Sequence, residues 1–137
     1  MIAASQTLLE TYFKAFDEGD TSGYASFYAS DVTLQNGAGE HLKGVDDIVA
    51  FYEKLRPNLV RTTHVRLVIE GEKSIAALLE SRFEVTAESA VFSGDTVRAG
   101  DRIQLKSMAL YELSGTKFQR ITARTIEKNI IRRGNSA

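Results

Sequence analysis

Residues 7–35 decide the fold, and they read TLLETYFKAFDEGDTSGYASFYASDVTLQ. Within residues 8–16, apolar and aromatic side chains recur at helical spacing, which predicts an amphipathic helix with an aromatic buried face. Thr7 and Glu10 have the spacing of a capping box, in which the hydroxyl and the carboxylate each satisfy an unpaired backbone amide. We therefore expect the helix to begin at Thr7.

The second half of this stretch predicts a turn, a short helix and a strand. Gly19 is expected to end the first helix, and Asp20 or Thr21 to cap a second one. An alternating strand at residues 32–35 follows at once. Two helices over the start of a sheet, with tyrosines on the buried side, predict a pocket rather than a solid core.

The composition is that of one globular domain spanning residues 1–137, with 43% hydrophobic and 26% charged residues. A net charge of −1 provides no field that attracts nucleic acid or anionic membranes, so neither is expected as a partner. The chain has no cysteine, which excludes disulfides, thiol catalysis and thiolate metal sites. No apolar run reaches the roughly 20 residues that cross a bilayer, and residues 1–6 lack the features of a signal peptide. We expect a cytoplasmic location.

The rest of the chain predicts one more helix and a series of strands. Asn36-Gly37 signals a tight turn, after which a short strand can pair back. Gly44 begins a third helix, and Pro57 stops it. Long alternating strands are then expected at residues 65–69, 75–85, 102–113 and 117–127. Three helices followed by antiparallel strands predict an α+β fold.

These long strands carry apolar residues on both faces. Alternation places Val65, Leu67 and Ile69 together on one face of their strand. One face of the sheet is expected to pack on the helices, and the other, with Leu78 and Leu110, to contact a second copy of the chain. The sequence therefore predicts a homodimer.

The order of these segments resembles the nuclear transport factor 2-like superfamily over residues 7–130, and most closely its ketosteroid isomerase and SnoaL-like polyketide cyclase branch. The resemblance implies a cone-shaped (cystatin-like) roll, with three N-terminal helices packed on a curved antiparallel sheet. It is carried by Glu10 to Asp20, Phe27 to Thr33, Asp47 to Tyr52, Glu80 to Glu84 and Glu127 to Ile130.

The resemblance also implies roles for individual residues. Tyr12 falls where the isomerases keep the tyrosine that donates a hydrogen bond to the substrate oxygen, and Tyr28 and Tyr52 fall where some members keep two tyrosines bonded to it. The two carboxylates of the isomerases are absent, because those positions read Asn36 and Met108. An amide cannot abstract a proton, so double-bond isomerisation by the family mechanism is not expected.

Each of these candidate residues also has a purely structural interpretation. The three tyrosines are equally consistent with packing residues whose hydroxyls reach water or backbone, and Asn36 with a plain turn residue. A histidine side chain is suited to acid–base catalysis, but the place of His41 on a short strand also fits a surface residue. No spacing of histidines predicts a metal site. The apolar wall of the pocket is expected to include Phe16, Leu79, Phe83, Met108, Ile121 and Ala123.

Two readings of the strand at residues 102–113 remain open. The family alignment turns Gln104, Lys106 and Met108 toward the pocket, whereas hydrophobic alternation turns Leu105, Ser107 and Ala109 toward it.

Two functional hypotheses follow. In the first, the pocket is catalytic, an isomerase, cyclase or dehydratase site in which Tyr12 polarises a carbonyl or hydroxyl of an apolar ligand without a cofactor. In the second, it is a binding or accessory domain that holds an apolar metabolite and performs no chemistry. Asn36 and His41 complete the catalytic candidates of the first hypothesis.

Overall fold

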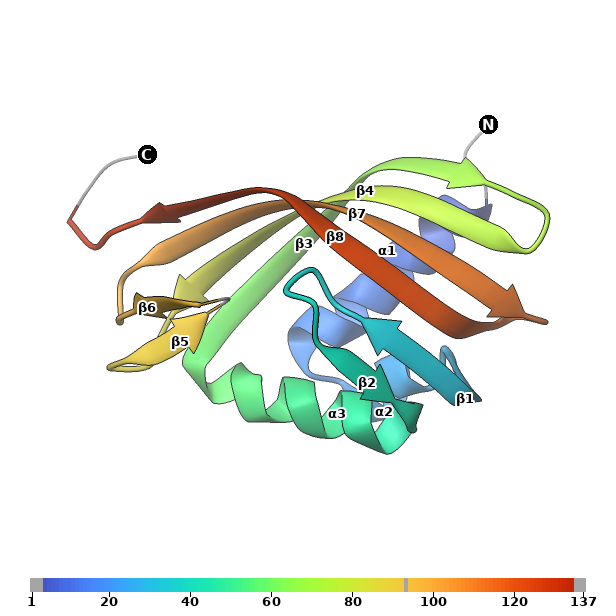
Figure 1. Cartoon of the computed structure of the whole chain (residues 1–137), viewed down its shortest axis with the longest axis horizontal. Coiled ribbons are helices and arrows are strands. Elements are labelled where there is room, and N and C mark those ends of the chain that lie inside the picture. Colours follow the sequence, from blue (N-terminus) through green and yellow to red (C-terminus); the bar gives the residue numbers. More distant parts are fainter. Residues whose placement is uncertain (1–3, 93, 135–137) are drawn as a thin grey trace.

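A strongly curved sheet arches over three helices, and its strands β2 and β1, at one edge, lie beside α3 (Figure 1). The computed structural model describes residues 4–92 and 94–134. Its elements in chain order are α1 (Ala4–Glu18), α2 (Thr21–Ala25), β1 (Tyr28–Gln35), β2 (His41–Lys43), α3 (Gly44–Leu55), a 3₁₀ turn (Arg56–Asn58), β3 (Leu59–Glu70), β4 (Ser74–Val85), β5 (Ala90–Phe92), β6 (Asp95–Val97), β7 (Arg102–Ser114) and β8 (Lys117–Ile131). The predicted α+β cone is confirmed.

The main sheet has the order β2-β1-β8-β7-β4-β3, and all neighbours but one are antiparallel. The exception is the parallel pair β1–β8. Where the two strands begin, the Phe118 amide donates to the Phe27 carbonyl at 2.7 Å. This pairing attaches the N-terminal helices and β1 to the last strand of the sheet. None of the described helices has the length and apolar character needed to cross a membrane.

The first helix starts earlier than the capping box predicted. It begins at Ala4, so Thr7 lies inside it, and Glu10 accepts a hydrogen bond from Gln6 Nε2 at 3.1 Å rather than capping the helix start. Contacts with β3 hold this first turn instead: the Ser5 hydroxyl donates to Glu70 Oε2, and Gln6 Nε2 also donates to the Val65 carbonyl at 3.3 Å. Contacts with β3, rather than a side-chain cap, therefore hold the start of the helix.

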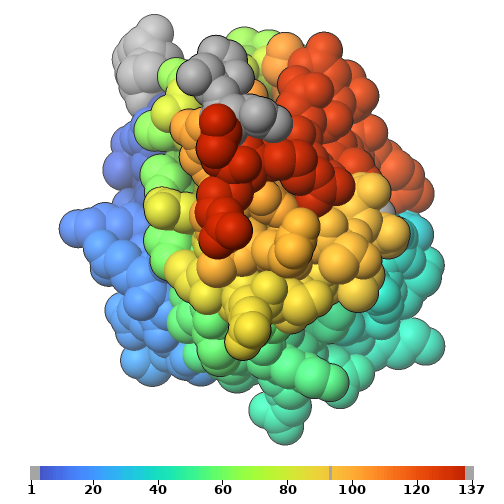
Figure 2. Space-filling model, turned by 90° about the vertical axis from the view of Figure 1, so that its left-hand side faces the viewer, coloured from blue at the N-terminus to red at the C-terminus, as the bar shows by residue number. Residues whose placement is uncertain are grey.

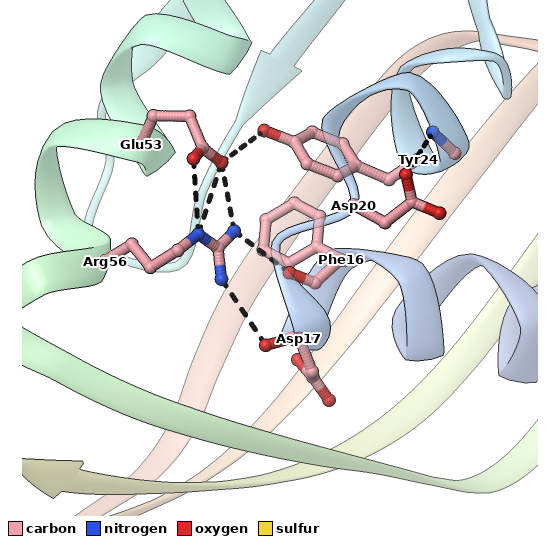
Figure 3. Close-up of polar contacts among 7 residues, drawn as sticks. Phe16, Asp17, Asp20, Tyr24, Glu53 and Arg56 are labelled. Atoms are coloured by element: carbon pink, nitrogen blue, oxygen red, sulfur yellow. Dashed lines mark hydrogen bonds and ion pairs between the residues drawn. The ribbon is translucent and has the colours of Figure 1, made fainter.

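The end of α1 is fixed by an arginine from beyond α3. Arg56 Nη2 donates to the Phe16 carbonyl at 3.1 Å and Nη1 donates to the Asp17 carbonyl at 3.4 Å, which satisfies two carbonyls of the last helical turn (Figure 3). Glu53 orients the guanidinium through an ion pair of 3.0 Å and accepts the Tyr24 hydroxyl at 3.1 Å. The Arg56 hydrogen bond lowers the pKa of Glu53, and burial raises the pKa of Tyr24 to about 12. These contacts join α1, α2 and α3.

Gly19 makes this arrangement possible, because it has a φ of +76° and a Cβ at this position would lie 2.7 Å from Arg56 Nε. We predict that Gly19→Ala lowers the free energy of unfolding by about 1–3 kcal/mol, through the left-handed conformation and the displaced arginine. Gly39→Ala is the matched control, since Gly39 has a φ of +92° and open space around the added carbon. Urea unfolding should show a larger loss for Gly19→Ala, and equal losses would mean that Arg56 contributes nothing at this site.

The concave face of the sheet carries the core, as β4 illustrates. Ile75, Ala77, Leu79 and Val85 are all buried there, whereas the other face carries Ala76 and Leu78 and then charged residues from Glu80 on. The prediction for β3 was wrong in part, because a bulge between Val65 and Leu67 reverses the alternation. Val65 stays on the helix side, whereas Leu67 and Ile69 are 50% and 57% exposed on the convex face.

The open end of the cone is covered by the β5–β6 hairpin. Figure 2 shows these segments (yellow to gold) between the ends of the long strands and the end of α3. Phe92 packs its ring against Phe83 with 4.9 Å between centroids. A small second cluster of apolar residues forms here, built on Leu59, Val97 and Ile103.

Candidate functional site

A cavity of about 710 Å³ lies between α1, α3 and the concave face of the sheet. The loop after β1 and the β5–β6 hairpin border it as well, through Asn36, Gly37, Val91 and Phe92. Its floor is formed by alternate residues of the three central strands: Leu79, Ser81 and Phe83 of β4, Leu105, Ser107, Ala109 and Tyr111 of β7, and Ile121, Ala123 and Thr125 of β8.

Small side chains in the floor explain why the cone is hollow. Ala109 is the direct cross-strand partner of Ala123, and Ser107 is the partner of Thr125. Larger residues at these central positions would extend into the space between sheet and helices, since inward side chains of a sheet stand roughly perpendicular to it. The cavity therefore results from the small residues of β7 and β8 and is not a packing defect.

Most predicted wall residues line this cavity, but three of the predicted site residues do not. Met108 is 37% exposed on the convex face, because the register of β7 sends even-numbered residues outward there. His41 is exposed on β2 and contacts Gln35 at 3.1 Å instead of the cavity. Tyr28 is buried behind the wall rather than in it. The predicted residues that do line the cavity are Tyr12, Phe16, Asn36, Tyr52, Leu79, Phe83, Ile121 and Ala123.

The open question about β7 is settled in favour of hydrophobic alternation. Leu105, Ser107 and Ala109 line the cavity. Lys106 points to the convex face, where it forms a 3.6 Å ion pair with Glu127.

Tyr12 is positioned by α1 on the wall of the cavity and is hydrogen-bonded to a second tyrosine. Its hydroxyl oxygen lies 2.6 Å from that of Tyr28, and either group can be the donor. The Tyr12 side chain is 2% exposed, and burial followed by the neighbouring phenols raises its pKa well above the ordinary 10.0. The pKa of Tyr28 is also raised, mainly by burial. Both groups therefore hold their protons at neutral pH and act as hydrogen-bond donors.

The predicted hydrogen bond between Tyr12 and Tyr52 is not found among the described residues, in which the Tyr12 hydroxyl bonds to Tyr28. Tyr52 contacts Phe16 with 4.7 Å between ring centroids, and Phe16 in turn contacts Tyr12 at 5.7 Å. Burial raises the pKa of Tyr52, and the charge of Arg61 and the nearby Asn36 side chain oppose that rise. Tyr12 and Tyr52 thus both contact Phe16, and they are two separate polar groups of the cavity lining.

Asn36 serves both of the roles weighed for it. Its Oδ1 accepts the backbone amides of Ala38 and Glu40, each at 3.0 Å, which holds the turn after β1. Because the oxygen is committed to the turn, the amide nitrogen is the atom available to donate to Tyr52. The residue is a turn anchor and a pocket amide at once.

Arg61 is the cavity residue that sequence reasoning missed. It lines the wall from β3, with its guanidinium carbon 5.0, 5.4 and 5.7 Å from the ring centroids of Phe16, Phe83 and Phe13. Its Nη2 donates to the Ser81 hydroxyl at a long 3.5 Å. The sequence held one signal for it. In the alternation that runs from Leu59 to Val65, Arg61 falls at a position that faces the helices. Tyr111, 2% exposed on β7, is a cavity phenol that was also missed.

Asp17 lies behind Arg61, outside the cavity lining. Its carboxylate accepts the Thr63 amide at 2.7 Å and the Thr63 hydroxyl at 3.1 Å, and Oδ1 is 3.7 Å from Arg61 Nε. Burial raises the pKa of Asp17, and the charge of Arg61 opposes that shift. Among the described residues that line the cavity, Glu40 is the only carboxylate, and it is exposed at the edge. The described residues contain no cluster of three metal-ligating side chains.

The paired phenols can be tested by stability. We predict that Tyr12→Phe lowers the free energy of unfolding by about 1–3 kcal/mol, because it leaves the buried Tyr28 hydroxyl without its partner. Tyr28→Phe should cost a similar amount, and the double substitution less than the sum, since neither hydroxyl is then orphaned. Urea unfolding of the four proteins measures this coupling, and strictly additive losses would mean that the two hydroxyls do not interact.

A curved sheet over three helices, with the cavity between them, places the chain among the nuclear transport factor 2-like cone folds. The chain belongs to the SnoaL-like domain family, which matches residues 9–121.

Solved structures share the fold at low identity. A proposed polyketide cyclase from Pseudomonas putida is 21% identical, with 86% of this chain and 88% of that one covered and a TM-score of 0.73. A proposed polyketide cyclase from Xanthomonas campestris is 17% identical, with 86% and 87% covered and a TM-score of 0.73. A proposed ketosteroid isomerase from Kribbella flavida is 18% identical, with 89% and 77% covered and a TM-score of 0.64. No protein of curated function matches the chain.

Proposed function

We propose that the protein binds an apolar small molecule whose carbonyl or hydroxyl group lies at the hydroxyl of Tyr12. The observation that carries the proposal is the cavity of about 710 Å³, in which aromatic and aliphatic side chains surround a few separated polar groups. Pockets of roughly 300–1,000 Å³ with this composition are typical small-molecule sites. The similarity to proposed polyketide cyclases and a ketosteroid isomerase supports a polycyclic ligand.

Tyr12 supplies the polarising contact. When Tyr28 donates its proton to the Tyr12 oxygen, Tyr12 is left free to donate its own to a ligand oxygen. Hydrogen bonds in such a chain strengthen one another, and the strengthening is greatest in a site that excludes water. The pair is thus suited to hold a carbonyl and to stabilise negative charge that develops on its oxygen.

In the part of the chain that the structure describes, the cavity offers no well-placed carboxylate base for proton abstraction. Glu40, the one carboxylate among the described lining residues, is exposed at the edge, and Asp17 lies outside the lining. The position of the isomerase base is occupied by Asn36, whose side chain holds a turn. We therefore propose that the cavity binds the ligand and polarises its carbonyl or hydroxyl. This favours the binding-domain hypothesis over isomerisation.

Binding of 2-acetylnaphthalene, an apolar aryl ketone, tests the proposal. We expect saturable binding to the wild type and an affinity lowered about 2- to 10-fold in Tyr12→Phe, as for loss of one neutral hydrogen bond. Tyr24→Phe is the matched control, because Tyr24 is a buried tyrosine that bonds to Glu53 outside the cavity lining. Absence of saturable binding, or equal affinity in Tyr12→Phe and the wild type, would refute the proposal.

We further propose that the protein is a homodimer formed through the convex face of the sheet. Leu67, Ile69, Met108 and Leu110 are between 37% and 57% exposed on this face, a contiguous apolar surface that water would otherwise cover. We predict sedimentation as a dimer at micromolar concentration, and as a monomer for Leu67→Asp.

Val91→Asp is the control for this prediction, since Val91 is 71% exposed but lies on β5, away from the convex face. It should leave the dimer intact. Monomeric sedimentation of the wild type would contradict the proposed interface.

A further inference from the structure

The inference concerns the polar chemistry of the ligand, and it rests on the proposed function of the cavity. Among the described residues, three cationic side chains line the cavity: Lys54, Arg56 and Arg61. Lys54 is exposed, and Arg56 is committed to Glu53 and to the carbonyls at the end of α1. Arg61 is the cation whose hydrogen-bonding capacity remains largely unused.

Only one nitrogen of the Arg61 guanidinium makes a hydrogen bond to a described residue, the 3.5 Å contact of Nη2 with the Ser81 hydroxyl. Nε is buried and has no hydrogen-bond partner among the described residues, because Asp17 Oδ1 stands 3.7 Å away. A buried charged donor left without partners is costly. Such a group calls for an explanation, and a ligand that accepts its hydrogen bonds is one.

Arg61 lines the cavity from β3, and its Nε also forms a 3.7 Å ion pair with Asp17 behind the wall. Asp17 already receives two hydrogen bonds from Thr63 and does not line the cavity. The positive charge of Arg61 reaches the phenols across the space, since it opposes the rise in the pKa of both Tyr52 and Tyr111. The cavity interior therefore has a positive end at β3.

Three aromatic rings hold the guanidinium in place. The ring centroids of Phe13, Phe16 and Phe83 lie within 5.7 Å of its central carbon, which limits its rotation. A planar guanidinium that is held in one orientation and only weakly hydrated is matched to the two oxygens of a carboxylate. An ammonium would not provide this two-point contact.

We propose that Arg61 binds a carboxylate of the ligand, so that the preferred ligand is an aromatic or polycyclic acid rather than a neutral ketone. The apolar body of the acid fills the space over Ala109 and Ala123. Its carboxylate lies at the Nη edge of Arg61, beside the Ser81 hydroxyl.

A pair of probes that differ only in charge tests this inference. The wild type is titrated at neutral pH with 2-naphthoate and with methyl 2-naphthoate, which share one ring system. We expect the acid to bind at least about 10-fold more tightly, the low end for a hydrogen-bonded ion pair. The difference should shrink as salt is added, because charge contributes to it.

Variants assign the preference to one residue. Arg61→Met should lower the affinity for 2-naphthoate about 10- to 100-fold while changing that for the ester little, and Arg61→Lys should recover only part of the loss. Arg66→Met is the matched control, an arginine of the same strand whose side chain forms a 2.7 Å ion pair with Glu80. It should leave both affinities unchanged.

The outcomes separate this inference from the proposed function. If the ester binds as tightly as the acid, the carboxylate assignment is overturned and the apolar pocket stands. If neither probe binds, both proposals fall. Equal losses of acid and ester in Arg61→Met would also overturn the assignment, because the residue would then act on the pocket as a whole.

Discussion

Ala109→Phe should abolish ligand binding while leaving the protein folded. Ala109 is 4% exposed in the middle of the cavity floor, next to Ala123 on the adjacent strand. A phenyl ring at this position would occupy the space that the ligand needs, and it would enter a void rather than a packed core. We therefore expect an affinity for 2-acetylnaphthalene at least about 100-fold lower, equivalent to roughly 2.7 kcal/mol, with a change in unfolding free energy below about 1 kcal/mol.

The neighbouring residue provides the control. Leu110 lies on the convex face and is 40% exposed, so Leu110→Phe adds a similar ring on the other side of the same strand. It should not alter ligand affinity. Wild-type affinity in Ala109→Phe would mean that the ligand lies elsewhere on the molecule.

Phe118→Ala should produce the largest loss of stability among these substitutions. Phe118 is fully buried, and its ring lies 5.2, 5.0 and 5.9 Å from those of Tyr12, Tyr111 and Phe27. It therefore joins α1, β7, β8 and the segment before β1. Removal of a buried phenyl ring typically costs about 3–5 kcal/mol, from lost transfer energy and the cavity that remains.

Phe51→Ala is the comparison for this loss. Phe51 is only half-buried on α3 and already borders the cavity, so its deletion leaves no new closed void. Urea unfolding should show a cost well below that of Phe118→Ala. A loss under about 1 kcal/mol for Phe118→Ala would contradict the view that this cluster anchors the cone.

Periodicity and turn chemistry carried most of the fold prediction. The alternation in β4 has no bulge, so its buried residues follow directly from the sequence. Gly19 and Asp20 were also recognisable, because a positive φ and a side chain that accepts the Gly23 amide at 3.1 Å are strongly associated with those residue types. At these positions the local sequence was enough to predict the structure.

Failures occurred where distant contacts override local signals. The bulge after Val65 reverses which side chains of β3 face the helices, and nothing in the local pattern places it there. The helix start moved to Ala4 because Ser5 and Gln6 are held by β3, some 60 residues later in the chain. Both depend on tertiary partners.

The site was harder to predict than the fold for a related reason. Met108 was assigned through an alignment whose register does not hold in β7, whereas simple alternation was correct there. Arg61 reads as an ordinary strand arginine until three phenylalanines from α1 and β4 are seen around it. Its chemistry arises from the assembly of the cavity.

The central claim, that Tyr12 polarises a ligand carbonyl inside the cavity, is tested most directly by infrared spectroscopy of bound 2-acetylnaphthalene labelled with ¹³C at the carbonyl. A hydrogen bond from Tyr12, supported by Tyr28, weakens the C=O bond. We expect the carbonyl stretch in the wild-type complex to lie at lower frequency than in apolar solvent, and to return most of the way toward the solvent value in Tyr12→Phe. The same frequency in both complexes would contradict the claim.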